Sequence, residues 1–280
     1  MSKILSIANH SRNFKGFSYI YPVVSRRSNG ISLGINLNLN NACNWRCVYC
    51  QVEGLVRGRP NAIDLIKLES ELEHMLNWIV NGDFIQEFAP LGLQRLNDIC
   101  LSGNGEPTLS ANFVEVCMII AKLRLKYNLN EQVKTILISN GSEMQKQFIQ
   151  DGLKIMAINN GEVWFKIDRG SVDGISRVNQ VTLSMDSILQ RLASSASICP
   201  TYVQSCWFSI NGVEPSEQEI ETFIQFLEPV KNIVSGVLLY STARNPALEE
   251  GKDISQVGNE FMLRLQSGLE RHGIRSNSYI

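Results

Sequence analysis

The sequence predicts an α/β fold in which parallel strands curl into a barrel. Runs of strand character alternate with runs of helix character six times along the 280 residues, and that order implies parallel strands joined by right-handed crossovers. Polar and apolar residues alternate in several strands, whereas strands between two helix layers are apolar on both faces. We therefore expect a TIM-like (βα)6 barrel whose interior holds a ligand, with an N-terminal extension and a C-terminal helix.

The expected elements follow one another without an internal repeat or a linker. The strand-like runs cover residues 33–40, 98–103, 135–139, 163–168, 203–211 and 236–242. The helix-like runs cover residues 64–80, 112–126, 142–156, 184–194, 216–227 and 255–271. Most of these helices begin at Asp, Asn or Ser, which favour the N-cap, and Ser216 with Glu219 makes a capping box pattern. We assign residues 1–30 to the extension, 31–245 to the barrel and 246–280 to a C-terminal helical segment.

Alternation within the strands indicates which side chains point into the barrel. In residues 33–40 the apolar Ile35, Leu37 and Leu39 alternate with asparagines, so that one face packs on helices and the other is polar. The same reasoning applied to the fourth and fifth strands completes a polar lining. The predicted inward residues are Asn36, Asn38, Lys166, Asp168, Ser205, Ser209 and Asn211.

Composition and charge limit the classes of partner and substrate that the sequence predicts. The 26 basic and 27 acidic side chains give a net charge of -1, which lacks the basic excess that binding to a phosphate backbone usually requires. No apolar run approaches the roughly 18 residues of a membrane span, and the first residues lack the pattern of a secretory signal. We expect a cytoplasmic protein with a small-molecule substrate and no membrane partner, and nucleic acid is disfavoured.

Three of the seven cysteines, Cys43, Cys47 and Cys50, lie within eight positions directly after the first predicted strand. In a reducing compartment such cysteines are metal ligands or buried side chains more often than disulfide partners. A structural zinc site needs four ligands, and neither a histidine nor a fourth cysteine stands nearby. Three thiolates on a tight loop suit a cubane iron–sulfur cluster with one iron lacking a protein ligand. A structural zinc site, or a cluster in a non-catalytic interaction protein, stays as the alternative.

The C-x3-C-x2-C spacing, with Tyr49 before the third cysteine, resembles the signature of the radical S-adenosylmethionine (radical SAM) enzymes. The resemblance implies that the barrel is a partial (βα)6 barrel with the cluster loop after its first strand. It also implies a [4Fe-4S] cluster on the three cysteines, with the amino and carboxylate groups of S-adenosylmethionine on the open iron. It implies that one electron, from a donor such as flavodoxin or ferredoxin, cleaves this cofactor to methionine and a 5′-deoxyadenosyl radical. That radical then takes a hydrogen atom from the substrate.

A second motif, Gly103-Asn104-Gly105-Glu106-Pro107, ends the second predicted strand and is similar to the GGEP motif of the same family. Glycines let the backbone approach a ligand closely, and the Glu106 carboxylate can accept from the ammonium of the methionine moiety. Taken alone, the run is typical of a turn. Its place beside the cysteine loop favours a role in binding the cofactor.

Polar residues also end the third, fourth and fifth predicted strands, where the family resemblance implies further contacts with the cofactor. These residues are Ser139 and Asn140, Lys166 and Asp168, and Asn211. An ordinary turn between strand and helix is the alternative at each position.

The resemblance extends from about Tyr21 to Ala247 and includes the segments SRRSNGISLGINLN, CNWRCVYCQV, SGNGEPTL, KIDRGSVDGISRVNQ and LLYSTARNPA. These segments look similar to a little-characterised branch related to the wyosine-forming tRNA-modifying enzymes. An obvious second cluster motif and a flavodoxin-like domain are lacking, which argues against tRNA. We therefore expect a small polar substrate, with a tRNA or nucleoside as the alternative. The remaining cysteines are expected in the core or have no assigned role; they are Cys100, Cys117, Cys199 and Cys206.

Overall fold

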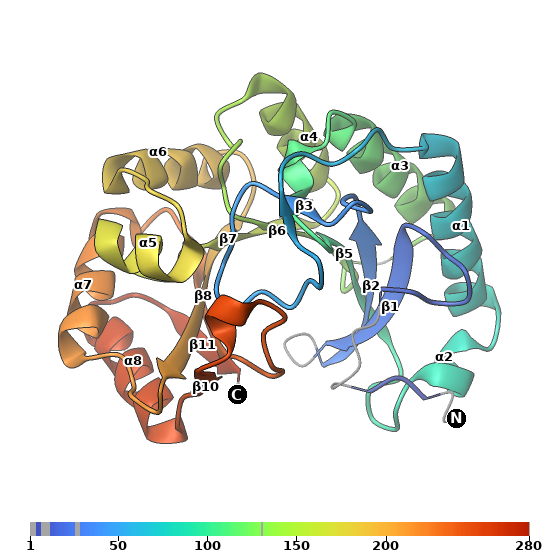
Figure 1. The fold of residues 1–280 in the computed structure, drawn as a ribbon. Coiled ribbons are helices and arrows are strands. Elements are labelled where there is room, and N and C mark those ends of the chain that lie inside the picture. Colours follow the sequence, from blue (N-terminus) through green and yellow to red (C-terminus); the bar gives the residue numbers. More distant parts are fainter. Residues whose placement is uncertain (1–3, 7–11, 26–28, 130, 280) are drawn as a thin grey trace.

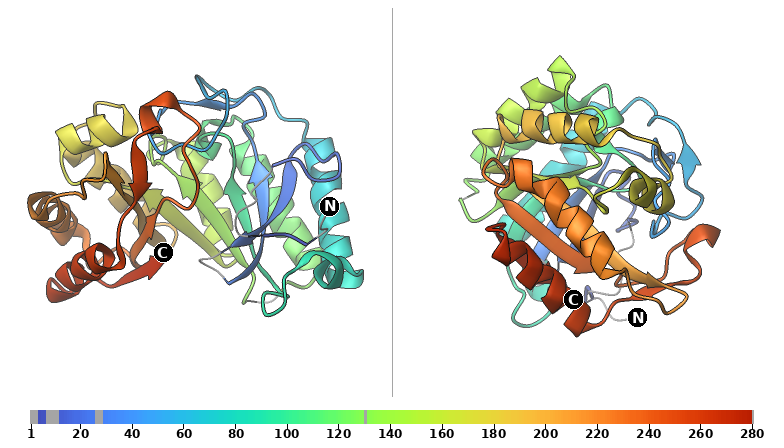
Figure 2. Two further views of the ribbon diagram at one scale, coloured as in Figure 1. Left: turned by 60° about the horizontal axis from the view of Figure 1, so that its bottom comes forward. Right: turned by 90° about the vertical axis from the view of Figure 1, so that its left-hand side faces the viewer.

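A curved sheet with helices on its outer face makes up the fold (Figure 1). The computed structural model describes residues 4–6, 12–25, 29–129 and 131–279. Within these residues the strands follow the order β1-β2-β5-β6-β7-β8-β9-β11, with β10 paired to β8. The sheet curls into an open half-barrel whose convex side carries the helices, so the predicted α/β partial barrel is confirmed as an architecture (Figure 2).

Strands are present at all six predicted places, and they pair in parallel in chain order. They are β2 (Gly30–Asn36), β5 (Leu96–Ser102), β6 (Lys134–Ser139), β7 (Gly161–Lys166), β8 (Thr201–Ile210) and β9 (Gly236–Ser241). The first strand ends at Asn36 and not at residue 40. The chain leaves the sheet there, because the amide of Asn38 donates to the Asn36 side-chain oxygen at 3.1 Å.

Helices follow these strands at the predicted places. They are α1 (Leu65–Asn81), α3 (Phe113–Lys126), α4 (Gln147–Ala157), α6 (Met185–Ala196), α7 (Glu217–Leu227) and α8 (Asn259–Arg271). The predicted capping box of Ser216 and Glu219 opens α7. Helix α4 starts later than predicted because residues 142–146 include a turn. Helix α8 starts later because β10 (Ile254–Gln256) pairs antiparallel with β8.

Several elements lie outside the predicted set. They are β1 (Ile20–Ser25), β3 (Ala42–Cys43), β4 (Val56–Arg57), α2 (Phe84–Phe88), α5 (Val172–Asn179), β11 (Ser276–Tyr279) and three short 3-10 segments, η1 (Pro107–Leu109), η2 (Glu228–Val230) and η3 (Glu249–Gly251). Strand β1 pairs antiparallel with β2, and β11 pairs parallel with β9. The predicted extension and C-terminal segment therefore each contribute an edge strand. Residues 1–3, 7–11 and 26–28 of the predicted extension lie outside the described residues.

The main apolar core lies between the convex face of the sheet and the helices. Ile31, Leu33 and Ile35 of β2 belong to this core and are fully buried. Because side chains alternate along a strand, the neighbouring Asn36 faces the interior of the half-barrel, as predicted. Its side-chain oxygen accepts from the amide of Asn104 at 3.0 Å, which ties β2 to the loop after β5.

The predicted inward face of β8 was wrong. Trp207 packs outward, with its ring centre 5.3 Å from that of Phe223 in α7. Ser205 shares this outward direction with Trp207, and Ser209 does as well, because residues two apart lie on one face. The alternate residues of β8, which include Gln204 and Cys206, line the interior instead.

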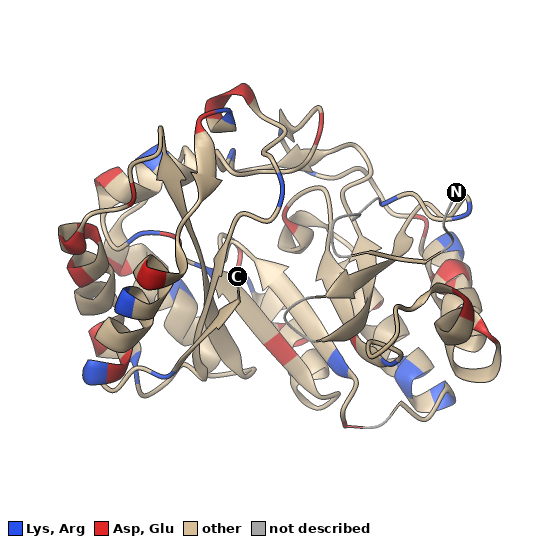
Figure 3. Cartoon of the chain, turned by 90° about the horizontal axis from the view of Figure 1, so that it is seen from below, with Lys and Arg blue, Asp and Glu red and all other residues tan. Residues whose placement is uncertain are grey.

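Charged residues of both signs are interspersed over the outer helices, and the strands contain few of them (Figure 3). Some join neighbouring helices, as Lys122 of α3 does with Glu69 of α1. Within the described part of the chain, no helix combines the length and the apolar character needed to cross a membrane.

Replacing Trp207 by alanine tests the outward packing of β8. The indole is fully buried against Phe223 and Phe261, so we expect Trp207→Ala to lower the free energy of unfolding by about 3–5 kcal/mol. Ser205→Ala is the matched control on the same face. The buried Ser205 hydroxyl has no hydrogen-bond partner among the described residues, and we expect a change below about 1 kcal/mol. Urea denaturation measures both, and equal effects of the two substitutions would contradict this packing.

Candidate active site

A cavity of about 320 Å³ fills the inside of the curved sheet and reaches the carboxyl ends of its strands. Small-molecule sites in proteins occupy roughly 300–1,000 Å³. Most of the residues predicted from the sequence line this cavity, namely Cys43, Cys47, Tyr49, Cys50, Gly103, Asn104, Gly105, Glu106, Asn140 and Lys166. Segments far apart in the chain are therefore brought to one site.

Three other predicted residues lie elsewhere. Ser139 and Asp168 stand directly behind the lining, where Ser139 donates to Glu106 at 2.7 Å and Asp168 accepts from Tyr49 at 2.5 Å. Asn211 is not brought to the cavity. It is exposed in the turn after β8, and its φ is 51°.

The cysteine loop, residues 43–50, is held against α5 by main-chain hydrogen bonds. The amide of Val48 donates to the carbonyl oxygen of Val178 at 2.9 Å, and the amide of Arg46 donates to the carbonyl oxygen of Asn179 at 3.3 Å. Helix α5 was not among the predicted elements, so this support for the loop was missed by the sequence analysis.

Two of the three thiols also receive N–H donors. The Asn179 side-chain amide donates to the sulfur of Cys47 at 3.2 Å, and the main-chain amide of Trp45 donates to that of Cys43 at 3.5 Å. Hydrogen bonds to the sulfur atoms are among the features that set the reduction potential of iron–sulfur clusters. The donors and the shared cavity wall fit a cluster held by these cysteines.

Burial raises the pKa of Cys43 to about 12, so the metal-free thiol is neutral at pH 7. A bound metal ion displaces the proton of such a ligand. Within the part of the chain that the structure describes, no three Cys, His, Asp or Glu side chains converge closely enough to hold one metal ion.

Asp168, just beyond β7, connects the cysteine loop to the barrel. Its carboxylate accepts from the Tyr49 hydroxyl at 2.5 Å, from the Asn179 side chain at 2.6 Å and from the Cys206 amide at 2.9 Å. Because the residue is only 1% exposed, these donors compensate for the water that the carboxylate loses. Through Asn179, Asp168 also positions the donor to Cys47.

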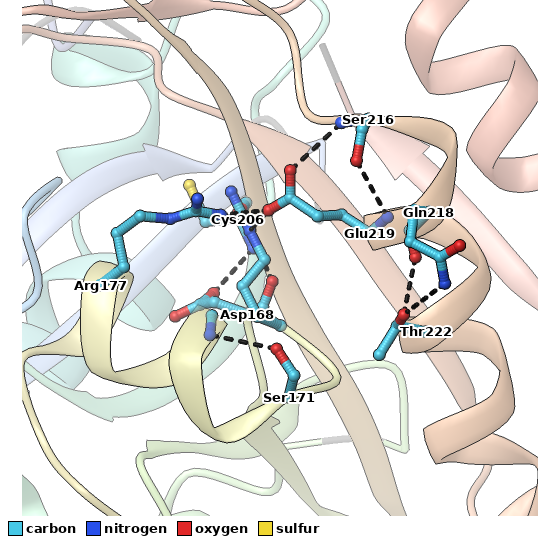
Figure 4. Close-up of polar contacts among 10 residues, drawn as sticks. Asp168, Ser171, Arg177, Cys206, Ser216, Gln218, Glu219 and Thr222 are labelled. Carbon is cyan, nitrogen blue, oxygen red and sulfur yellow. Dashed lines mark hydrogen bonds and ion pairs between the residues drawn. The ribbon is translucent and has the colours of Figure 1, made fainter.

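A buried arginine extends this anchoring to α7 (Figure 4). The Nη1 atom of Arg169 donates to the carbonyls of Asp168 and Cys206 at 2.5 and 3.0 Å. Glu219, in the capping box of α7, lies 3.7 Å from Arg169 Nε and also pairs with Arg177 of α5. Glu219 therefore holds α5, the helix that supports the cysteine loop.

The segment after β9, residues 244–251, covers another side of the cysteine loop. Arg46 of the loop donates to the Glu250 carboxylate at 2.7 Å. A Cβ atom on Gly251 would lie 2.1 Å from the Val48 carbonyl oxygen, so only glycine allows this close contact.

The glycine motif also packs against the cysteine loop. A Cβ atom on Gly105 would lie 2.1 Å from the carbonyl oxygen of Ala42, and the Asn104 side chain donates to that of Asn41 at 2.6 Å. The sequence predicted that glycines here admit a ligand. In the structure, Gly105 already serves a close approach between two loops.

Glu106 is 3% exposed and is fixed by four donors. Its Oε1 atom accepts from the amide and hydroxyl of Thr108 at 3.1 and 2.6 Å and from Ser139, and its Oε2 atom accepts from the amide of Asn140 at 2.6 Å. Burial raises the pKa of Glu106, although these donors oppose the shift. With one donor in place, Oε2 has room for a further donor from the cavity.

Lys166, at the end of β7, holds its ammonium 4.7 Å from the centre of the Tyr49 ring. Burial lowers its pKa, but Tyr240, Cys47 and Asp168 raise it by more, so the net pKa is raised. Cys100, expected in the core, is buried but lines the cavity. The sequence analysis missed further lining residues because no motif marks them: Arg12, Tyr21, Trp164 and Gln204.

Replacing Asp168 tests its role as the anchor of the cysteine loop. Asp168→Ala removes the acceptor of three hydrogen bonds, and a bond to a charged group contributes about 1.5–3 kcal/mol. We expect the amides of residues 45–50 to exchange with deuterium at least roughly tenfold faster, as measured by mass spectrometry. Asp151→Ala, which removes a surface carboxylate of α4, is the control and leaves this exchange unchanged. Wild-type exchange in Asp168→Ala would refute the anchor.

Comparison with known proteins gives no matching family model. A UPF0026 protein of Helicobacter pylori is 28% identical over 211 residues, which are 75% of this chain and 61% of that protein. The chain thus spans about three fifths of the length of this relative.

Two solved structures share the arrangement of strands and helices. A radical SAM methyltransferase from Sphaerobacter thermophilus has a TM-score of 0.60 at 13% identity, over 89% of this chain and 66% of that one. SuiB of Streptococcus suis, bound to S-adenosylmethionine, has a TM-score of 0.55 at 12% identity, over 90% of this chain and 48% of that one. The chain shares the fold of these two proteins, and this is the fold that the resemblance in its cysteine and glycine motifs implies.

Proposed function

We propose that the chain is a radical SAM enzyme that binds a [4Fe-4S] cluster, cleaves S-adenosylmethionine reductively and abstracts hydrogen from a small polar substrate. The observation that carries the proposal is the meeting of Cys43, Cys47 and Cys50 with the glycine motif in one cavity. The cavity reaches the carboxyl ends of the strands, where the active sites of βα barrels lie. The shared fold with a structure bound to S-adenosylmethionine supports the same cofactor here.

The residues of the chain supply ligands and positions for this reaction. The three cysteines hold the cluster, which, when bound, supplies the electron that cleaves S-adenosylmethionine to a hydrogen-abstracting radical. Gly105 and Glu106 receive the methionine end, because Glu106 Oε2 keeps an open acceptor position toward the cavity. Further contacts with the cofactor are proposed for Tyr49, Gly103, Asn104, Ser139, Asn140, Lys166 and Asp168. Asn211 is left out of the proposal because it is exposed beyond β8.

A small polar substrate fits the cavity better than a folded tRNA. The lining mixes polar side chains such as Ser102 and Gln204 with the aromatic ring of Trp164 inside the curve of the sheet. The net charge of -1 gives no overall attraction to a polyanion. A nucleoside or tRNA stays as the alternative substrate, on the sequence resemblance alone.

The proposal includes an electron donor such as flavodoxin or ferredoxin and a cytoplasmic location. All seven cysteines are free thiols, which is the state that a reducing compartment maintains. A low-potential donor is required because the cluster must be reduced before it can cleave the cofactor.

Removing one thiol tests the cluster. We expect anaerobically purified protein to be brown, with about four irons and four sulfides per chain, and Cys47→Ala to lose them because one of three ligands is gone. Cys117→Ala is the matched control, since Cys117 is buried in the core and is 2% exposed. Iron and sulfide assays and visible absorption measure the content. Colourless wild-type protein with one zinc per chain would favour the structural zinc site instead.

Removing the Glu106 carboxylate tests its contact with the cofactor. Glu106→Ala is expected to weaken binding of S-adenosylmethionine by about ten- to a hundredfold, because a charge-assisted hydrogen bond is lost. Isothermal titration of the cluster-loaded protein measures this affinity. Thr108→Val is the control: it keeps the carboxylate, removes one of its hydroxyl donors and is expected to change the affinity less. An unchanged affinity of Glu106→Ala for S-adenosylmethionine would refute the assignment of Glu106 as a cofactor contact.

A further inference from the structure

Two donor side chains stand next to each other on the inner wall of the half-barrel. Lys166 of β7 and Gln204 of β8 are bridge partners in the parallel sheet, and both line the cavity. Partners in a ladder present their side chains on the same face, so the ammonium and the amide group share one part of the wall. Gln204 matches no motif of the sequence.

No described carboxylate pairs directly with the Lys166 ammonium, although Asp168 is among the groups that raise its pKa against the effect of burial. The ammonium takes part in no ion pair or hydrogen bond with a described residue, and it lies 4.7 Å from the centre of the Tyr49 ring. The ammonium therefore keeps its N–H donors for an anion in the cavity.

The amide of Gln204 is also unpartnered. The residue is 1% exposed, and its amide nitrogen has no acceptor among the described residues. Buried polar side chains are bonded in most proteins, and an exception requires an explanation such as an absent ligand.

The carboxylates that lie on or behind the cavity wall are bonded elsewhere. Glu106 accepts from four donors and Asp168 from three, while Asp98 accepts from the hydroxyl of Ser32. The wall around Lys166 and Gln204 therefore has donors that these carboxylates do not use, and an acceptor on a bound ligand would match them.

We propose that Lys166 and Gln204 form a subsite for a carboxylate group inside the half-barrel. A carboxylate has two oxygens, so it accepts from the ammonium and from the amide at once. Its single negative charge also matches the one cation of this pair. Trp164, two residues before Lys166 on the same inner face, gives an aromatic surface for the body of the ligand.

The carboxylate has two possible sources, which are S-adenosylmethionine and the substrate. The first source rests on the proposed function, because it requires binding of that cofactor. The second requires only that a carboxylate-bearing molecule enters the cavity.

The test compares wild-type protein with Lys166→Met and Gln204→Leu, and uses Lys166→Arg as the variant that keeps the cation. The probes are S-adenosylmethionine, its decarboxylated analogue, and the small carboxylates acetate, succinate and benzoate. Isothermal titration on the cluster-loaded protein gives each affinity, and circular dichroism shows that each variant is folded.

If the cofactor supplies the carboxylate, both neutral variants bind S-adenosylmethionine about tenfold or more weakly and bind the decarboxylated analogue as the wild type does. If the substrate supplies it, the variants bind S-adenosylmethionine normally. The wild type saturated with S-adenosylmethionine then binds at least one small carboxylate, the neutral variants bind it about tenfold more weakly, and Lys166→Arg retains binding.

The subsite is refuted if both neutral variants bind S-adenosylmethionine normally and also bind every small carboxylate as the wild type does. The carboxylate titrations are repeated on cluster-free protein. A second outcome is that the protein takes up neither a cluster nor S-adenosylmethionine and still binds a carboxylate through Lys166 and Gln204. That result would refute the proposed function and support the subsite.

Discussion

The carboxylate of Asp168 is the contact on which the arrangement of the site depends. A buried anion must be bonded on all sides, and here its donors come from the cysteine loop, from the end of α5 and from β8. Three segments that are far apart in the chain are therefore fixed relative to one another by one group. Glu219 plays the corresponding part farther out, because it holds Arg169 and Arg177 together. The orientation of the Cys47 thiol follows from this chain of contacts.

Much of the fold and part of the site could be predicted from local signals. Strand β2 alternates apolar and polar residues, and Asp64 and Ser216 cap α1 and α7. These signals depend only on neighbouring residues, so the order of elements is readable. The cysteine and glycine motifs directly follow two of the strands. Since parallel strands end at one edge, their meeting in a single cavity could be expected.

The remainder depends on contacts that local patterns do not encode. Both faces of β8 are buried, so polarity does not distinguish inside from outside, and Trp207 fills a space between α7 and α8 that only the folded barrel creates. Helix α5 has eight residues and is stabilised by its Ser171 cap and by the pairing of Arg177 with Glu219. The edge strands β1 and β11 exist only where a partner strand accepts them. The position of Gln204 on the cavity wall could not be predicted, because it depends on which residues of β8 face inward in the folded protein.

The contacts that enclose the cysteine loop set an order for its biosynthesis. Cys47 bonds to Asn179, 132 positions later, and Arg46 pairs with Glu250, 204 positions later. At a translation rate of about 5–20 residues per second, the cysteines emerge roughly 10–40 s before the last of these partners is made. During that interval the loop lacks the contacts with Asn179 and Glu250 that hold it in the folded chain. The cysteine loop therefore reaches its full support only after the chain is complete, and anything that binds to the supported loop binds after that point.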